Sequence, residues 1–157
     1  MAKVRFESEW KLWAGLAAVI ALVIVYLYFA SRPPMEGGEY LWNVTKIVDS
    51  RTLSLRGSGS LIQFRLAGLV VPKSQEKALQ DFLAKNLLNE WVRIKILREG
   101  PQGTKEGLVY LSGEDITARI IRQGLAEIDR NETAFDVRPY IELEQEAKKQ
   151  RKGLWGE

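Results

Sequence analysis

The chain has 157 residues, of which 46% are hydrophobic and 27% charged, and its formal net charge is +3. This composition is typical of a folded protein, and the length allows one domain with one short additional element. The sequence contains neither cysteine nor histidine. Disulfides, thiolate or histidine metal sites and Ser/His or Cys/His nucleophile pairs are therefore excluded, and we expect no cofactor. Hydrolysis would need carboxylate, Arg, Lys or Tyr side chains, with a hard cation held by oxygen atoms.

The first predicted element is a transmembrane helix over Leu12 to Ala30, a segment without any charged residue. At about 1.5 Å per residue, such a helix would be roughly 28 Å long, close to the hydrocarbon thickness of a bilayer. Trp10 and Trp13 lie at one end, and Tyr26 and Tyr28 lie near the other. This distribution matches the aromatic belts of membrane-spanning helices. We therefore expect the lipid bilayer to be a partner of this segment.

A cleaved signal peptide is the alternative for this segment. Its apolar block would be unusually long, and a cut after Ala30 would place Tyr28 where a small residue is preferred. Lys3, Arg5 and Lys11 precede the segment. By the positive-inside rule, residues 1–11 form a short cytoplasmic N-terminus and the domain lies on the opposite, periplasmic or extracytoplasmic, side.

Residues 31–39 form a predicted linker, because paired prolines stop a helix and paired glycines add freedom. Residues 40–157 form the predicted domain, which begins with three strands, over Tyr40 to Val48, Thr52 to Arg56 and Leu61 to Ala67. The segment Gly57 to Ser60 between the last two predicts a hairpin turn.

A helix is expected next, capped by Ser74 and ending near Asn89. Its apolar face comprises Leu79, Phe82, Leu83 and Leu87.

A fourth strand follows over Trp91 to Arg98, with Val92, Ile94 and Ile96 pointing inward. The fifth strand is expected over Gly107 to Ser112.

Two further helices complete the chain, one over Glu114 to Gln123 and one from Asp136 to Gly153, with Pro139 in its first turn. This order predicts an α+β domain, a five-stranded OB-type barrel with three helices, preceded by one N-terminal transmembrane helix.

Several landmarks in order resemble the staphylococcal-nuclease-like (thermonuclease) family. The segment Val44 to Thr52 resembles the opening strand of that family and its D-G-D-T turn, and Phe64-Arg65-Leu66 resembles its F-R-L stretch. Arg122 to Ala126 reads R-Q-G-L-A, as in the family, and Gly153-Leu154-Trp155 matches the end of its last helix. The resemblance implies an OB barrel over residues 43–156.

Members of this family hydrolyse nucleic acids with Ca²⁺, which implies two carboxylate ligands, a glutamate that activates water and two phosphate-binding arginines. At the matching positions this chain carries Arg51 and Val70 for the two acids, Lys73 for the glutamate and Glu106 for one arginine. Only the other arginine is retained, as Arg65. The two nucleotide-contacting tyrosines of the family fall near Arg130 and Glu132.

The departures predict that neither a metal site nor any catalytic residue remains. A calcium ion would meet Arg51, Arg65 and Lys73, whose charges repel it. The resemblance also implies that Glu106 lies near Arg51 and Arg65 and forms an ion-pair cluster with them. The alternative is that these side chains drifted independently and point into water.

Two other groups of residues admit a functional and a structural interpretation. Lys148 and Lys149 suit phosphate or anionic lipid, although acidic residues one turn earlier on the same helix would balance them. Trp42 and Trp91 could stack on bases, although tryptophans at the starts of strands more often belong to a core.

Three hypotheses of function follow. The first is a non-catalytic, membrane-anchored module for protein–protein interaction or assembly, as an accessory subunit of a membrane complex, with a membrane protein as partner. The second is a nucleic-acid-binding module on the membrane, for which Arg65, Lys148 and Lys149 are the candidate residues. The third is a divergent Ca²⁺-dependent nuclease, for which Asp49, Glu106 and Asp129 are the remaining candidate acids.

Overall fold

A computed structural model describes residues 41–156 of the chain. The predicted N-terminus (1–11), transmembrane helix (12–30) and linker (31–39) lie outside the described residues and remain predictions. Within residues 41–156, no helix combines the length and the apolar character needed to cross a bilayer.

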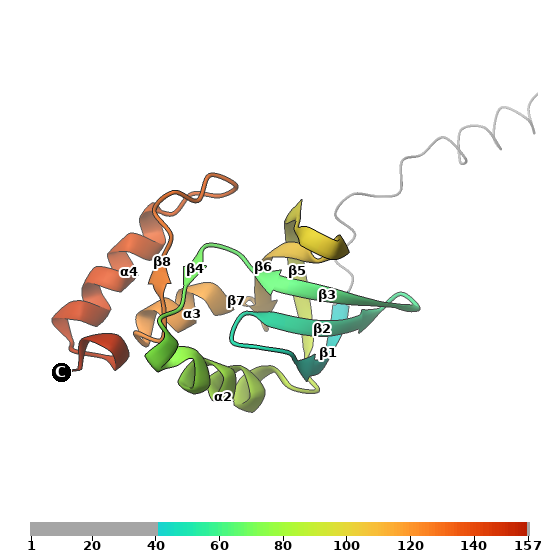
Figure 1. The fold of residues 1–157 in the computed structure, drawn as a ribbon, viewed down its shortest axis with the longest axis horizontal. Coiled ribbons are helices and arrows are strands. Elements are labelled where there is room, and N and C mark those ends of the chain that lie inside the picture. Colours follow the sequence, from blue (N-terminus) through green and yellow to red (C-terminus); the bar gives the residue numbers. More distant parts are fainter. Residues whose placement is uncertain (1–40, 157) are drawn as a thin grey trace, which may run out of the picture. The chain divides into compact units, whose positions relative to one another are not determined.

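Five strands form a closed barrel, as predicted (Figure 1). They are β1 (Leu41–Ile47), β2 (Thr52–Gly57), β3 (Ser60–Leu66), β5 (Trp91–Glu99) and β6 (Lys105–Leu111). Neighbouring strands pair in the order β3-β2-β1-β5-β6, and a parallel pairing between β3 and β6 closes the sheet. The β2–β3 hairpin turns at Ser58 and Gly59, both with positive φ, as expected for a two-residue turn.

The remaining strands each contain two residues: β4 (Leu69–Val70), β7 (Glu114–Asp115) and β8 (Glu127–Ile128). Strand β4 pairs with β8 outside the barrel. This pairing joins the segment after β3 to the segment that follows the helix Ile116–Arg122. Three single 3₁₀ turns complete the structure: η1 (Lys73–Gln75), η2 (Pro101–Gly103) and η3 (Gly153–Trp155).

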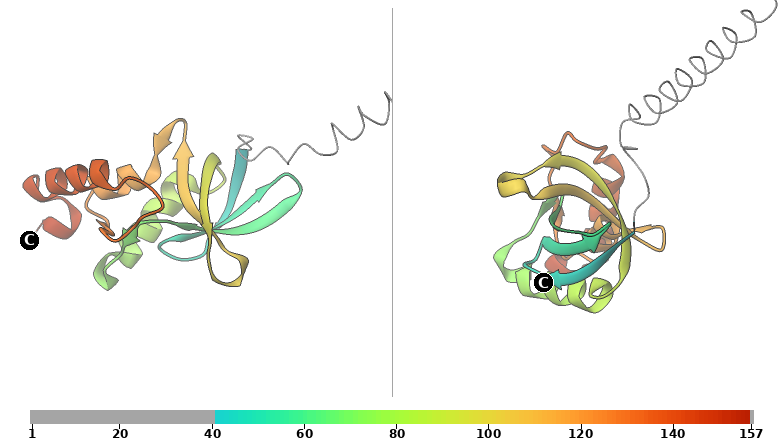
Figure 2. Two further views of the ribbon diagram at one scale, coloured as in Figure 1. Left: turned by 90° about the horizontal axis from the view of Figure 1, so that it is seen from above. Right: turned by 90° about the vertical axis from the view of Figure 1, so that its right-hand side faces the viewer.

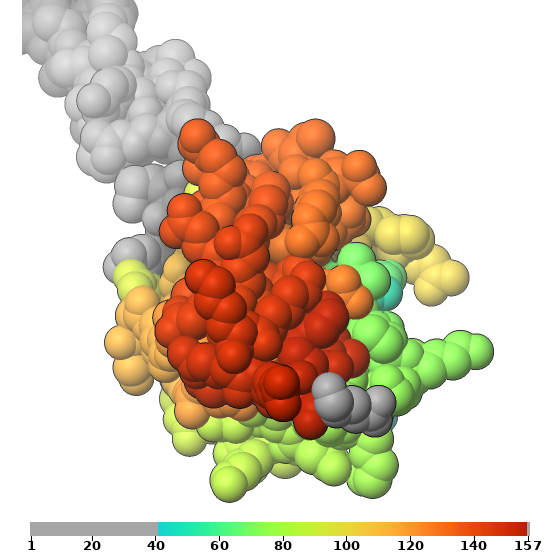
Figure 3. Space-filling view, turned by 90° about the vertical axis from the view of Figure 1, so that its left-hand side faces the viewer, coloured from blue at the N-terminus to red at the C-terminus, as the bar shows by residue number. Residues whose placement is uncertain are grey.

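Three helices accompany the barrel: α2 (Glu76–Leu87), α3 (Ile116–Arg122) and α4 (Arg138–Lys149). In Figure 1 and in the left-hand view of Figure 2, α4 lies at the opposite end of the domain from the β2–β3 hairpin. The space-filling view in Figure 3 shows α4 and the chain after it covering that end of the domain. The sequence therefore correctly predicted five barrel strands and three helices.

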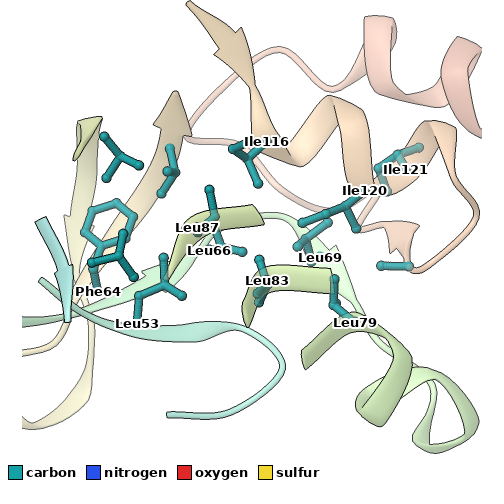
Figure 4. Packing of buried hydrophobic residues seen from close by; sticks show 14 of the residues in the cluster. Leu53, Phe64, Leu66, Leu69, Leu79, Leu83, Leu87, Ile116, Ile120 and Ile121 are labelled. Atoms are coloured by element: carbon teal, nitrogen blue, oxygen red, sulfur yellow. The ribbon is translucent and has the colours of Figure 1, made fainter. Parts of the chain in front are cut away.

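The core joins the barrel to the helices. Leu79, Leu83 and Leu87 of α2 are fully buried, as their helical spacing predicted, and Phe82 packs against the core from its edge. They meet Phe64 and Leu66 of β3 and isoleucines of α3 in one continuous apolar cluster (Figure 4).

Three local expectations were wrong. Ser74 does not cap α2, because the chain first makes the turn η1 after Pro72, and the N-cap residue is Gln75. Ile96 is exposed, because the β5–β6 register shifts between Ile96 and Arg98 and breaks the inward–outward alternation. Trp42 packs on the core, whereas Trp91 is 58% exposed rather than a core residue.

Candidate functional site

The candidate site is a cleft of about 360 Å³ beside the turn between β1 and β2. The turn, strand β3, the segment after β4 and the first turns of α2 enclose it. Its lining residues are Val48, Asp49, Ser50, Arg51, Arg65, Val71, Glu76 and Gln80. The fold thus brings together Arg51 and Arg65, which the resemblance had placed in one site.

The Asp49 carboxylate is occupied by the turn itself. Its Oδ1 accepts hydrogen bonds from the backbone N–H groups of Arg51, at 2.7 Å, and Thr52, at 2.8 Å. The N–H groups of Val48 and Asp49 in turn donate to the Thr52 carbonyl. This arrangement is an Asx-turn, in which the aspartate side chain accepts hydrogen bonds from the backbone of the same turn. One of the two Asp49 carboxylate oxygens is thus engaged by the turn.

Arg51 places a cation in the cleft at the position where the resemblance implies an acid. Its Nη1 donates to the Leu69 carbonyl oxygen at 2.7 Å, which holds the guanidinium against the end of β3 and β4. Burial lowers the pKa of Arg51, and repulsion from Arg65 lowers it further. The negative charges of Asp49, Glu106 and Glu76 partly oppose this shift.

Glu106 is held by two arginines on the side of the barrel where β3 and β6 pair. Arg65 and Glu106 are register partners in that pairing, and Arg65 Nε lies 3.5 Å from Glu106 Oε1. Arg98 Nε lies 2.5 Å from the other oxygen, Oε2. The predicted pairing of Glu106 with Arg65 is therefore confirmed. Among the described residues Arg51 makes no direct ion pair with Glu106: its Nη1 donates to the Leu69 carbonyl, and Glu106 acts on it only through the attraction of its charge.

Neither Arg98 nor the pairing of Glu132 with it was identified from the sequence. Arg98 Nη1 donates to Glu132 Oε1 at 2.7 Å, so one arginine bridges two glutamates. The hydrogen bond from Arg98 is the main cause that lowers the pKa of Glu132. Arg98 reaches Glu106 only because the register shift in β5 pairs these two residues across the ladder. No local pattern in the sequence signals that shift.

Val70 and Lys73 are both exposed and are not among the residues that line the cleft. Val70 lies in β4 opposite Glu127, and Lys73 begins the turn η1.

The donor set does not suit a calcium ion. Within residues 41–156, no group of three or more acidic side chains could hold a metal, so Asp49, Glu106 and Asp129 do not form one. Only Asp49 among those three lines the cleft. Asp129 serves its own turn, where it accepts a hydrogen bond from the Asn131 N–H at 2.9 Å.

Lys148 belongs to a second charged cluster, built around the fully buried Glu144 of α4. Glu144 accepts hydrogen bonds from Lys148 Nζ at 2.6 Å, Arg130 Nη2 at 2.9 Å and the Ile128 N–H at 3.0 Å. Lys148 Nζ also lies 4.2 Å from the ring centroid of Trp155. Lys149 is exposed. Lys148 thus has structural partners, and a nucleic-acid role for these lysines remains a prediction.

Comparisons with known proteins agree with this fold. The family model described as "Staphylococcal nuclease homologue" matches residues 63–157, from β3 to the end of the chain. A protein of Capnoides sempervirens, described as an uncharacterized 38.1 kDa protein, is 30% identical over 97 residues. That alignment covers 59% of this chain and 28% of the relative, so the chain matches little more than a quarter of that protein's length. Because the family model covers more than half of the chain, the protein belongs to the family of staphylococcal nuclease homologues.

Proposed function

We propose that this protein is a non-hydrolytic, membrane-anchored member of its family, which acts as an interaction or assembly module. The observation that carries the proposal is the Arg51 guanidinium in the cleft, hydrogen-bonded to the Leu69 carbonyl. A hydrolytic site of the family's type needs anionic oxygen ligands at this place, and a fixed cation repels the metal that those ligands would hold.

The other charges of the cleft support the same proposal. Asp49 is committed to the backbone of its turn, and Glu106 is committed to Arg65 and Arg98. Of these two acids only Asp49 lines the cleft, and its Oδ1 is engaged by the turn; the other acid that lines the cleft is Glu76, at the start of α2. OB barrels present a face and loops that can bind partners after catalysis is lost.

The anchor is the second part of the proposal. It rests on the uncharged segment Leu12 to Ala30 with its aromatic flanks. A small domain held at a membrane suits an accessory subunit of a membrane complex, with a membrane protein as partner. The cationic residues before the segment favour a domain on the periplasmic or extracytoplasmic side.

Nucleic-acid binding is a second candidate function, favoured by one observation. Arg51 and Arg65 repel one another across the cleft, and a phosphate group between them would relieve this repulsion. We place it second because Asp49 and Glu76 also line the cleft and offset both arginines.

A cleavage and binding assay on the detergent-extracted full-length protein tests the proposal. We expect no Ca²⁺-dependent cleavage of single-stranded DNA or RNA by the wild type. The matched control is the Asp49→Asn/Glu106→Gln variant, which removes the acids that a relocated site would use. Cleavage by the wild type that this variant abolishes would overturn the proposal. Salt-sensitive binding of an oligonucleotide without cleavage, lost in Arg65→Gln, would instead establish the second candidate.

The anchor has its own test. The full-length protein should remain in the membrane fraction after carbonate washing and keep its full size. A soluble protein, or a mature N-terminus near Ser31, would show that the segment is a signal peptide. Protease digestion of the domain from the cytoplasmic face would overturn the orientation. A membrane protein that co-purifies in constant ratio after detergent extraction would identify the partner.

A further inference from the structure

Three large apolar side chains are exposed at the end of the barrel where β1 begins. Leu41 is 52% exposed, Trp91 58% and Leu61 60%. They line one shallow hollow of about 430 Å³, together with the β2–β3 hairpin. We call Leu41, Leu61 and Trp91, with Arg56 between them, the β1-edge patch.

The strand register explains why these side chains form one surface rather than isolated exposed residues. Trp91 is paired with Asn43, Asn43 with Arg56, and Arg56 with Leu61, so one row of neighbours crosses β5, β1, β2 and β3. Leu41 lies two residues before Asn43 on β1, and therefore on the same face of the sheet. The patch is thus a continuous strip on the outer side of the barrel.

The chemistry of the strip suits the interface between lipid and water. Among the described residues that line the hollow, Arg56 is the only charged one, and glycine and serine of the hairpin make up much of the rest. Tryptophan and leucine insert among headgroups and the upper acyl chains, and an arginine beside them pairs with lipid phosphate while its stem stays apolar.

We infer that the β1-edge patch rests on the bilayer surface and orients the domain there. This inference rests on the proposed membrane anchor, because the length of chain before the domain limits where β1 can begin. Residues 31–40 separate the predicted span from Leu41. At about 3.3–3.6 Å per residue, they reach at most roughly 35 Å. Leu41 is the described residue that follows the predicted span most closely along the chain, and it belongs to the patch.

A second copy of the chain fits this surface less well. A stable protein–protein interface buries about 800 Å² on each partner, more than three side chains and a hairpin offer. A tethered contact with the bilayer needs less area, because the anchor keeps the patch at a high effective concentration beside the membrane.

The absence of cysteine from the sequence allows a direct test in the full-length protein. A single cysteine introduced by Leu61→Cys is labelled with a fluorophore, and the protein is placed in nanodiscs that contain anionic lipid. The matched control is Gln145→Cys, an exposed position on α4, at the opposite end of the domain from the hairpin. Quenching is measured with lipids brominated on the acyl chains and with aqueous iodide.

We expect brominated lipid to quench the label at position 61 at least twice as strongly as the label at position 145, and iodide to show the reverse order. Equal quenching at the two positions would overturn the inference. Protection of position 61 from both quenchers would also overturn it, because a protein surface would then cover the patch. Release of the protein by carbonate would refute the anchor itself, and the inference with it.

A second variant separates contact from simple proximity. Leu41→Ser combined with Trp91→Ser should leave the protein anchored and folded, as checked by carbonate washing and circular dichroism. We expect the lipid quenching at position 61 to fall by at least half. Unchanged quenching would mean that the tether alone holds the hairpin near the membrane, and that the patch makes no contact.

Discussion

Two glutamates of this domain each contact two basic side chains, yet they differ in how far they are exposed to solvent. Glu106, at the side of the barrel near the cleft, keeps 14% of its side-chain surface exposed and contacts Arg65 and Arg98. Glu144, between β8 and α4, is fully buried and contacts Arg130, Lys148 and the backbone N–H of Ile128.

Burial of the carboxylate is the feature that makes such an ion pair important for stability. Burial alone would raise the pKa of Glu144, but hydrogen bonds from Lys148, the Ile128 N–H and Arg130 outweigh it and hold the pKa below its usual range. A buried carboxylate depends on every one of these partners, because no water replaces them. Around Glu106, water can take the place of a lost partner. We therefore expect the Glu144 cluster to stabilise the fold and the Glu106 cluster to determine mainly the charge of the cleft.

The largest effect is expected for Glu144→Gln. Glutamine at this fully buried position cannot replace the charged acceptor of three hydrogen bonds and brings an NH₂ group against the two cations, so the free energy of unfolding should fall by about 2 kcal/mol. Urea unfolding of the fragment from residue 39 onward, which contains the whole described core, measures this change. The matched control is Glu142→Gln, an exposed position on the same helix, where we expect a change within about 0.5 kcal/mol. Equal losses in the two variants would remove the basis of the comparison.

The pH dependence of stability tests the contribution of the buried glutamate in a second way. The pKa of Glu144 is lower in the folded state than in the unfolded state, where it is about 4.3. Its contribution is therefore present above that value and is lost as the pH falls through the folded pKa. Thermal unfolding at a series of pH values should show the wild type and Glu144→Gln converging as the pH falls below about 4.3. A gap that stays constant down to the acid limit would contradict the assignment.

Glu106→Gln should have a smaller effect. We expect the free energy of unfolding to fall by about 1 kcal/mol, because Arg98 keeps Glu132 and Arg65 remains partly exposed to water. Urea unfolding beside Glu144→Gln gives the ratio directly. A loss equal to that of Glu144→Gln would mean that the ion pairs of Glu106 contribute as much to the free energy of unfolding as those of the buried Glu144.

Arg65→Gln is expected to change stability least among these substitutions, by less than about 0.5 kcal/mol. Arg65 lies 3.5 Å from Glu106, whereas Arg98 lies 2.5 Å from it. A double-mutant cycle should therefore assign a larger coupling to Arg98 with Glu106 than to Arg65 with Glu106. The reverse order would show that Arg65 is the principal partner.

Calcium should have no effect at all. Both Glu106 oxygens are engaged by arginines, and the cleft acids Asp49 and Glu76 lie beside Arg51 and Arg65, which repel a cation. We therefore expect no Ca²⁺ binding, and a cation that does not bind leaves the melting temperature unchanged. Thermal unfolding with and without millimolar Ca²⁺ checks this. A Ca²⁺-dependent rise that disappears in Glu106→Gln would show that a metal competes successfully with the arginines.

The five barrel strands, the three helices and the buried face of α2 could be predicted from the sequence, because alternating and helical spacings of apolar residues are local properties. The transmembrane helix is also a sequence prediction, and it lies outside the described residues. Arg65 and Glu106 could be paired in advance only through the family resemblance.

The other contacts depend on how distant segments of the chain pack together. The register shift in β5 exposes Ile96 and brings Arg98 to Glu106, and a chain segment far along the sequence brings Glu132 to the same arginine. The burial of Glu144 depends in the same way on the packing of α4 against β8. These partners come from strand register and from packing between distant segments, which no local spacing encodes.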